Sequence, residues 1–274
     1  MADRYAVIGN PVSHSKSPAI HAEFARQTGQ NMSYLPILAP LHGFVAAVKD
    51  FINQGGKGMN VTLPFKEEAF RLAMPNVSIR ASEAEAVNTM RFDGGLIVGE
   101  NTDGMGLVKD IQHNLMQSAL TGKRILLLGA GGAARGVILP LLEFKPALLT
   151  VANRTFSKVS ALEQRFTRYG NIKASEYAAL AGNKYDLVIN ATSASIAGEL
   201  PPLPAKVFAS DSLAYDLMYG GGPTPFLRFA QAQGAARLAD GLGMLVEQAA
   251  ESFYFWRGVR PDTRQVITKL KGKE

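Results

Sequence analysis

The chain has 274 residues, and its 47% hydrophobic and 19% charged content is that of an ordinary globular protein with room for two domains. It lacks cysteine, which excludes disulfide scaffolds and thiolate sites, and its four histidines have no metal-ligand spacing, so we expect no metal. The 29 basic and 23 acidic residues give a net charge of +6 without an aromatic-basic module, which favours phosphorylated or anionic small molecules over nucleic acid as partners.

Residues 1–103 alternate between strand and helix patterns, which predicts an α/β domain. A hairpin signal at Asp93-Gly94 lies near the end of this domain, and a helix at 104–117 is predicted to lead into a second domain. The predicted strands are Tyr5–Ile8, Met32–Ile37, Gly58–Thr62, Ala86–Arg91 and Leu96–Glu100, with helices at Pro18–Thr28 and His42–Asn53.

The second domain opens with a glycine-rich turn between a strand and a helix. The strand Ile125–Leu128 breaks into Gly129-x-Gly131-x-x-Ala134, a helix runs to about Phe144, and Leu148–Asn153 is the next buried parallel strand. In this βαβ unit the glycines permit a tight turn and close approach of backbone N–H groups to a pyrophosphate. The pattern predicts a dinucleotide-binding domain with a doubly wound parallel sheet.

The end of the second strand indicates which dinucleotide binds. NAD sites place an acid there for the ribose hydroxyl, whereas this chain has Arg154 and Lys158. A guanidinium can hold the 2′-phosphate of NADP, so we expect NADP; two solvated cations are the alternative. Further strands are predicted near Leu187–Asn190, Ser212–Leu217 and Ala236–Ala239, and a helix at Leu242–Arg257 closes the chain.

Polar residues follow the predicted elements of the first domain, where ligands of open α/β sheets bind. Ser15 and Ser17, in an extended segment, could point their hydroxyls the same way, although Ser17 could instead cap the helix at Pro18. Lys66 could supply a proton or a positive charge, or be a surface cation. Asn88 and Asp103 lie at two more element ends, where an Asp before Gly is often only a turn residue or a helix cap.

These motifs together resemble one enzyme family. The segments are Asn10-Pro-Val-Ser-His-Ser-Lys-Ser-Pro18, Asn60-Val-Thr-Leu-Pro-Phe-Lys66, Ala86-Val-Asn-Thr89, Asn101-Thr-Asp-Gly104, Gly129-Ala-Gly-Gly-Ala133, Asn153-Arg-Thr155 and Gly241-Leu-Gly-Met-Leu-Val-Glu-Gln248. In this order they are similar to shikimate dehydrogenases of the bacterial, NADP-dependent class. The resemblance implies a substrate domain at 1–103, an NADP-binding Rossmann-like domain at 104–240, a C-terminal segment at 241–274 whose helix packs back on the substrate domain, and a cleft between the domains.

The resemblance also implies roles for individual residues. Ser15 and Ser17 would hold the substrate carboxylate, and Thr62, Asn88, Asp103, Gln248 and Tyr219 would bind the ring hydroxyls and carboxylate. Lys66 and Asp103 would be the catalytic pair, because an ammonium can stabilise and protonate the oxygen formed when hydride reaches a ketone. The implied cofactor residues are Gly129, Ala130, Gly131, Gly132, Ala133, Asn153, Arg154, Thr155, Phe156, Ser157, Lys158, Leu217 and Gly241.

The implied reaction is the reversible NADPH-dependent reduction of 3-dehydroshikimate to shikimate, on the route to chorismate and aromatic amino acids. Lys158 stands where many members carry a second arginine, which keeps the charge but loses the planar fork. Two alternatives are a quinate/shikimate dehydrogenase that accepts NAD, which tends to carry an acid after Arg154, and a non-catalytic dinucleotide sensor. We expect a cytoplasmic monomer or homodimer that binds neither nucleic acid nor a membrane.

Overall fold

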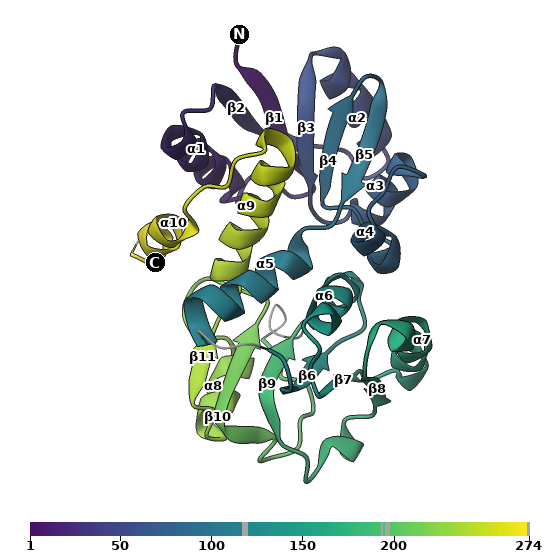
Figure 1. Ribbon diagram of the computed structural model, residues 1–274, viewed down its shortest axis with the longest axis vertical. Coiled ribbons are helices and arrows are strands. Elements are labelled where there is room, and N and C mark those ends of the chain that lie inside the picture. The colour runs from purple at the N-terminus through teal and green to yellow at the C-terminus, as the bar shows by residue number, and fades with distance from the viewer. Residues whose placement is uncertain (117–119, 193, 195–197, 273–274) are drawn as a thin grey trace. The chain divides into compact units, whose positions relative to one another are not determined.

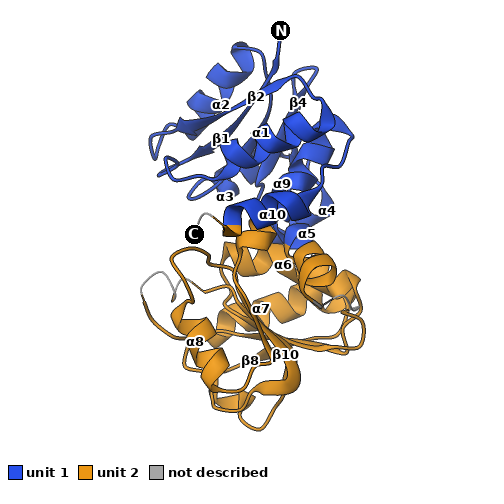
Figure 2. Cartoon of the chain, turned by 90° about the vertical axis from the view of Figure 1, so that its left-hand side faces the viewer, with its two compact units in different colours: residues 1–106, 246–270 blue, residues 107–245, 271–274 orange. Residues whose placement is uncertain are grey.

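The computed structural model describes residues 1–116, 120–192, 194 and 198–272. The chain forms two compact units, one of residues 1–106 and 246–270 and the other of residues 107–245 and 271–274 (Figures 1 and 2). It passes from unit 1 to unit 2 within helix α5 (Asp103–Lys109) and returns within helix α9 (Leu242–Arg257). Each unit therefore contains a segment that lies far away in the sequence from the rest of that unit.

Unit 1 is built on a five-stranded mixed sheet (Figure 1). The strand order is β2-β1-β3-β4-β5, with β1, β2 and β3 parallel and β4 antiparallel to both of its neighbours. The predicted hairpin at Asp93-Gly94 is confirmed, since it joins β4 to β5. The strands are β1 (Asp3–Gly9), β2 (Met32–Leu38), β3 (Gly56–Val61), β4 (Thr89–Asp93) and β5 (Leu96–Glu100).

Both faces of this sheet are covered because successive side chains of a strand point in opposite directions. In β1, Ala6 and Ile8 join the apolar cluster that includes α2, α3 and α4, whereas Tyr5 and Val7 pack with Tyr34. The second face also carries aromatic residues of α1 and α9. The helices are α1 (Ser17–Thr28), α2 (Phe44–Asn53), α3 (Lys66–Ala73), α4 (Ile79–Ala84) and α10 (Thr263–Lys271).

Unit 2 is built on a six-stranded sheet in which every described strand pairing is parallel. Its order, β11-β10-β9-β6-β7-β8, is that of a dinucleotide-binding doubly wound fold, with the reversal of order between β6 and β9. The predicted Rossmann-like parallel sheet is therefore confirmed. The strands are β6 (Arg124–Leu128), β7 (Leu148–Ala152), β8 (Ile172–Ser175), β9 (Tyr185–Asn190), β10 (Phe208–Asp216) and β11 (Arg237–Ala239).

Helical segments cover both faces of the second sheet. One apolar cluster packs α5, α6 and α7 on one side, and another packs η3 and α8 on the opposite side. None of the described helices is long and apolar enough to cross a membrane. The helical segments are α6 (Gly132–Glu143), α7 (Phe156–Phe166), α8 (Pro225–Ala232), the π-helical η1 (Asp110–Met116) and the short 3₁₀ turns η2 (Thr167–Tyr169) and η3 (Ala178–Leu180).

Three features differ from the sequence-based expectation. The helix predicted at 104–117 is α-helical only through Lys109 and then continues as the π-helix η1, while Gln117 lies outside the described residues. The strand predicted at Ala86–Arg91 begins at Thr89, because the backbone before it bonds to Lys66 and Glu100 across a loop. The helix at Leu242–Arg257 does not close the chain, since α10 follows it and buries Val266 and Ile267.

Candidate active site

The predicted substrate residues of unit 1 gather at one edge of its sheet because of strand direction. β1 and β3 are parallel, so the loops that follow them, carrying Ser15 and Lys66, leave the same edge. The hairpin then reverses the chain, so the residue before β4, Asn88, and the residues after β5, up to Asp103, return to that edge. Backbone hydrogen bonds from Val61 N to Asn88 O at 2.8 Å and from Asn88 N to Glu100 O at 3.1 Å join these segments.

Lys66 and Asp103 form an ion pair at this edge. The Lys66 ammonium donates to Asp103 Oδ2 at 2.5 Å, and the two side chains remain 27% and 14% exposed. Lys66 begins α3 and Asp103 begins α5, so both side chains project from the first turn of a helix. The pair is held in place yet accessible, as a proton donor and its orienting group must be.

Asn88 fixes the other oxygen of the Asp103 carboxylate. Its Nδ2 donates to Asp103 Oδ1 at 2.8 Å, and its Oδ1 accepts from the backbone N of Thr102 at 2.8 Å. The buried amide is therefore held in one orientation, with its donor end toward the carboxylate. Asn101 adds a further bond, because its side-chain Oδ1 accepts from the backbone N of Asp103 at 3.1 Å.

Gln248 reaches the same group from α9. Its Oε1 accepts from Asn88 Nδ2 and from Thr102 Oγ1, each at 3.4 Å. Gly106 makes this approach possible, because a Cβ at that position would lie 2.6 Å from the backbone N of Gln248. The structure thus brings together four of the predicted substrate residues, Lys66, Asn88, Asp103 and Gln248.

The serine motif folds differently from the expected extended segment. Lys16 has helical dihedral angles, φ −79° and ψ −10°, and α1 already begins at Ser17. Ser17 therefore does not cap the helix; instead its backbone N donates to Ser15 Oγ at 3.2 Å. The two serines remain adjacent, with Ser17 buried at 8% exposure.

Thr62 and Tyr219 occupy different units. Thr62 lies directly after β3, where its backbone N donates to Ile8 O at 3.0 Å. Its side chain packs against Gly9, at which a Cβ would lie 2.4 Å from Thr62 Cγ2. Tyr219 follows β10 in unit 2, and its part in a substrate site remains a prediction.

Sequence reasoning did not single out a set of buried polar residues beneath the ion pair. Asn60, Thr89, Thr102 and Ser252 are each at most 7% exposed and bond to one another, and Tyr34 bonds to Asn60. Asn60, Thr89 and Thr102 stand inside the quoted motifs, within two positions of residues that were assigned roles. Ser252 stands four residues after Gln248, on the same face of one helix, and that spacing was the available signal.

The glycine turn of unit 2 lies at the point where the strand order reverses. Gly129 directly follows β6 and has a φ of +109°, a conformation that favours glycine. At Gly131 and Gly132 an added Cβ would meet no atom within 4 Å, so both backbones face open space at the start of α6. A pyrophosphate fits this place, because the N-terminal N–H groups of the helix attract an anion.

The basic segment after β7 also begins a helix. Asn153 Nδ2 donates to Thr155 O at 3.1 Å, and α7 starts at Phe156. Arg154 and Lys158 are both exposed and flank this start. The two cations and the N-terminus of the helix would all attract a phosphate, so this arrangement favours the phosphate role over that of two solvated surface charges.

Leu217 and Gly241 lie against each other in unit 2. A Cβ at Gly241 would be only 2.1 Å from Leu217 O, so no other residue fits without backbone movement. Asp216 holds the segment after Leu217, since its carboxylate accepts from Met218 N at 3.1 Å and from Thr224 Oγ1 at 2.6 Å. The two predicted cofactor residues therefore belong to one closely packed loop pair, which is also joined by a bond from Gly241 N to Met218 O at 3.1 Å.

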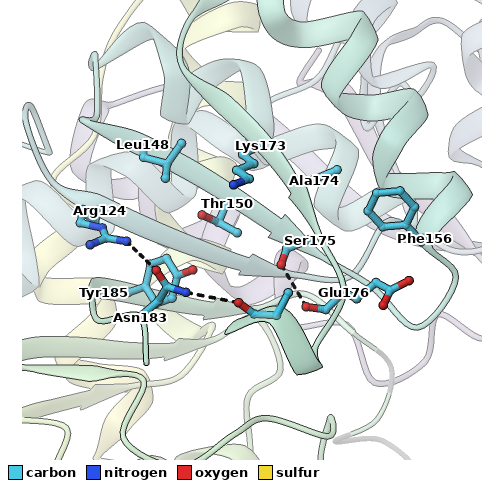
Figure 3. A pocket seen from close by; sticks show the side chains of 11 residues that line it. Arg124, Leu148, Thr150, Phe156, Lys173, Ala174, Ser175, Glu176, Asn183 and Tyr185 are labelled. Carbon is cyan, nitrogen blue, oxygen red and sulfur yellow. Dashed lines mark hydrogen bonds between the residues drawn. The ribbon is translucent and has the colours of Figure 1, made fainter. Parts of the chain in front are cut away.

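A hollow of about 280 Å³ opens on the sheet of unit 2 near β7 and β8 (Figure 3). Arg124 and Phe156 lie toward opposite ends of it, and Lys173 adds a second cation. Of the predicted cofactor residues only Phe156 lines this hollow, so the hollow is separate from the predicted pyrophosphate site at the glycine turn. Within the described residues, no group of three or more His, Asp or Glu side chains could hold a metal ion.

Known protein families match the chain along most of its length. Family models for the shikimate dehydrogenase substrate binding domain, shikimate/quinate 5-dehydrogenase and the shikimate 5′-dehydrogenase C-terminal domain match residues 7–90, 110–197 and 241–271. A curated relative, shikimate dehydrogenase (NADP(+)) of Nitrosospira multiformis, is 60% identical over 99% of this chain and 98% of its own. The chain belongs to the shikimate dehydrogenase family.

Solved structures of the family share the fold. An Ael1 enzyme from Pseudomonas putida is 53% identical with a TM-score of 0.94, over 98% of each chain. The shikimate 5-dehydrogenase of Thermus thermophilus, solved with NADP(H) and shikimate, is 34% identical with a TM-score of 0.85, over 97% of each chain. The family and the two-domain α/β fold expected from the motifs are thus confirmed.

Proposed function

We propose that the chain is an NADP-dependent shikimate dehydrogenase, which reversibly reduces 3-dehydroshikimate to shikimate. The observation that carries the proposal is the Lys66–Asp103 ion pair, held by Asn88 at the edge of the unit 1 sheet. The parallel sheet of unit 2, with its glycine turn, supplies the dinucleotide-binding half. We assign unit 1 to the substrate and unit 2 to NADP.

Lys66 performs the proton chemistry of the reduction. When bound, NADPH supplies a hydride, and negative charge then develops on the oxygen of the substrate ketone. The Lys66 ammonium stabilises that charge and donates a proton to the oxygen. Asp103 accepts a hydrogen bond from Lys66 Nζ at 2.5 Å and keeps the lysine oriented. The Asp103 carboxylate also accepts a hydrogen bond from a hydroxyl of the substrate.

The remaining polar residues orient the substrate ring. Ser15 and Ser17 bind the carboxylate, and Thr62, Asn88, Gln248 and Tyr219 bind the hydroxyls and carboxylate. The adjacency of Ser15 and Ser17, and the contacts of Gln248 with Asn88, support this assignment. A small polyhydroxylated acid needs such a dense set of donors and acceptors, because each unpaired polar group costs affinity.

The cofactor residues divide into three groups. Gly129, Ala130, Gly131, Gly132 and Ala133 would hold the pyrophosphate, where added Cβ atoms at Gly131 and Gly132 would project into open space. Asn153, Arg154, Thr155, Phe156, Ser157 and Lys158 would hold the adenosine 2′-phosphate at the start of α7. Leu217 and Gly241 would contact the nicotinamide half.

We further infer a cytoplasmic enzyme that acts on the way to chorismate and aromatic amino acids, as a monomer or homodimer. Its substrate is a small molecule that must carry a carboxylate to use the serine pair. Gel filtration with light scattering would measure the mass in solution and decide between one and two copies.

A crossed-substrate assay tests the proposed reaction. The purified chain is mixed with shikimate or quinate and with NADP or NAD, and the absorbance of the reduced cofactor is followed. Shikimate with NADP should give by far the highest kcat/KM. A higher value with quinate or NAD would replace the proposal with the broader quinate/shikimate activity, and no turnover with any pair would indicate a non-catalytic dinucleotide sensor.

A further inference from the structure

A buried series of hydrogen bonds links helix α9 to the ion pair within unit 1. It begins at Tyr34, whose hydroxyl lies 2.7 Å from Asn60 Oδ1. Burial raises the pKa of Tyr34 well above its ordinary value, so the hydroxyl is protonated and donates. Asn60 Oδ1 is thereby identified as an acceptor, and the Nδ2 of the same amide must point the other way.

Ser252 receives the amide end of Asn60. Asn60 Nδ2 lies 2.9 Å from Ser252 Oγ, and that serine is fully buried on α9. Its Oγ also lies 2.8 Å from Thr89 Oγ1, 3.2 Å from Thr102 Oγ1 and 3.1 Å from Gln248 O. The Ser252 hydroxyl thus contacts the backbone of the helix that carries Gln248 and both threonines that bond to Asn88.

The two threonines set the orientation of Asn88. Thr89 Oγ1 donates to Asn88 Oδ1 at 3.0 Å, and the backbone N of Thr102 donates to the same oxygen at 2.8 Å. At the other end of the amide, Asn88 Nδ2 donates to Thr102 Oγ1 at 3.0 Å. With Oδ1 occupied by donors, Nδ2 faces Asp103 Oδ1 at 2.8 Å. Reversing the amide would place an oxygen against the carboxylate, so this orientation decides whether Asp103 is supported.

We propose that Ser252 is a positioning residue for the reduction: through Thr89 and Thr102 it holds the Asn88 amide against Asp103. It touches no substrate itself, because its side chain is fully buried and lies one helical turn beyond Gln248. The inference rests on the proposed function, since it concerns the same ion pair. It adds a residue whose effect should appear in turnover rather than in binding alone.

A simple packing role predicts a different outcome. If Ser252 only fastened α9 to the sheet, its removal would lower stability and change little in the enzyme that remains folded. After Ser252→Ala, Asn60 Nδ2 still has Thr89 Oγ1 at 3.0 Å and Asn88 O at 3.2 Å as acceptors. The fold should therefore survive. Thr89 and Thr102 lose a shared partner, so their hydroxyls hold the Asn88 amide less firmly, although the bond from Thr102 N remains.

The test compares the kcat and KM values of Ser252→Ala with those of the wild-type enzyme, using shikimate and NADP. We expect kcat to fall about 10-fold, with a smaller change in the KM for shikimate. The loss should be larger in kcat than in the KM for NADP, because the Asn88–Asp103 contact supports the Lys66 proton donor rather than the cofactor. Ser252→Thr keeps the hydroxyl and should recover most of the rate.

The matched control is Ala249→Gly, which weakens the same helix at a fully buried position outside the hydrogen-bond network. Trp256 fluorescence measures the folded fraction of each variant. A wild-type kcat in Ser252→Ala would overturn the inference, as would a loss of kcat no larger than that of Ala249→Gly. If Ser252→Ala does not fold, Ser252→Cys is judged by the same criteria. A wild-type chain that turns over no substrate would refute the proposed function instead.

Discussion

Acidification should destabilise unit 1 through a single buried histidine. The His21 ring is fully buried and stacks on Tyr34 with ring centroids 4.2 Å apart. Neither of its nitrogens has a hydrogen-bond partner among the described residues. Burial lowers the pKa of His21 from 6.5 to about 3, although the neighbouring Asn60 side chain opposes the shift. The folded protein therefore holds this ring neutral at physiological pH.

The size of the effect follows from the two pKa values of His21. The unfolded chain takes up the proton near pH 6.5 and the folded chain only near pH 3, so stability is fully present above the first value and falls as pH decreases. About pH 5 lies roughly 1.5 pH units below the pKa of His21 in the unfolded state. The free energy of unfolding there is therefore about 2 kcal/mol lower than at about pH 7.5. Below about pH 3 the loss levels off near 5 kcal/mol.

Urea unfolding followed by Trp256 fluorescence measures this effect in the right unit. Trp256 is the chain's only tryptophan, it belongs to unit 1, and its ring lies 5.4 Å from that of His21. When the pH is lowered from about 7.5 to about 5, the free energy of unfolding of His21→Gln should fall by about 2 kcal/mol less than that of the wild-type protein. His42→Gln, at an exposed histidine, should follow the wild-type protein. Equal pH dependence in His21→Gln and wild type would refute the reasoning.

Three further changes test the proposed site. Lys66→Ala should lower kcat by about 10²- to 10⁴-fold with a far smaller change in KM, because it removes the proton donor; near-normal turnover would contradict the assignment. Arg154→Ala should raise the KM for NADPH about 10-fold or more and hardly affect weak NADH use, so equal effects on both cofactors would argue against a 2′-phosphate role. Gly241→Ala should raise the KM for NADPH and lower stability by about 1–3 kcal/mol in thermal unfolding, because its Cβ would meet Leu217 O at 2.1 Å. An unchanged melting temperature and KM in Gly241→Ala would show that the two loops move apart at little cost, and would contradict the prediction.

Local patterns in the sequence were sufficient wherever structure depends on near neighbours. The strand Ile125–Leu128, the turn at Gly129 and the strand at Leu148 could be predicted because apolar runs and glycine act over a few residues. The hairpin at Asp93-Gly94 could be predicted for the same reason. Sequence reasoning failed where a neighbour in space changed the backbone, as at Lys16, whose helical conformation places Ser15 Oγ beneath the N–H of Ser17.

The sequence by itself determined the family and the cofactor class, and it predicted the residues of the proposed chemistry, because all of these are written as short motifs in order. Only the tertiary structure decided how they meet. Three parallel strands and one reversed hairpin bring Lys66, Asn88 and Asp103 to one edge, and that depends on strand order rather than on any local signal. Ser252 and His21 likewise acquire their roles from groups that α1 and α9 pack against, far away along the chain. Burial and hydrogen bonding are properties of the packed core, and no single motif contains them.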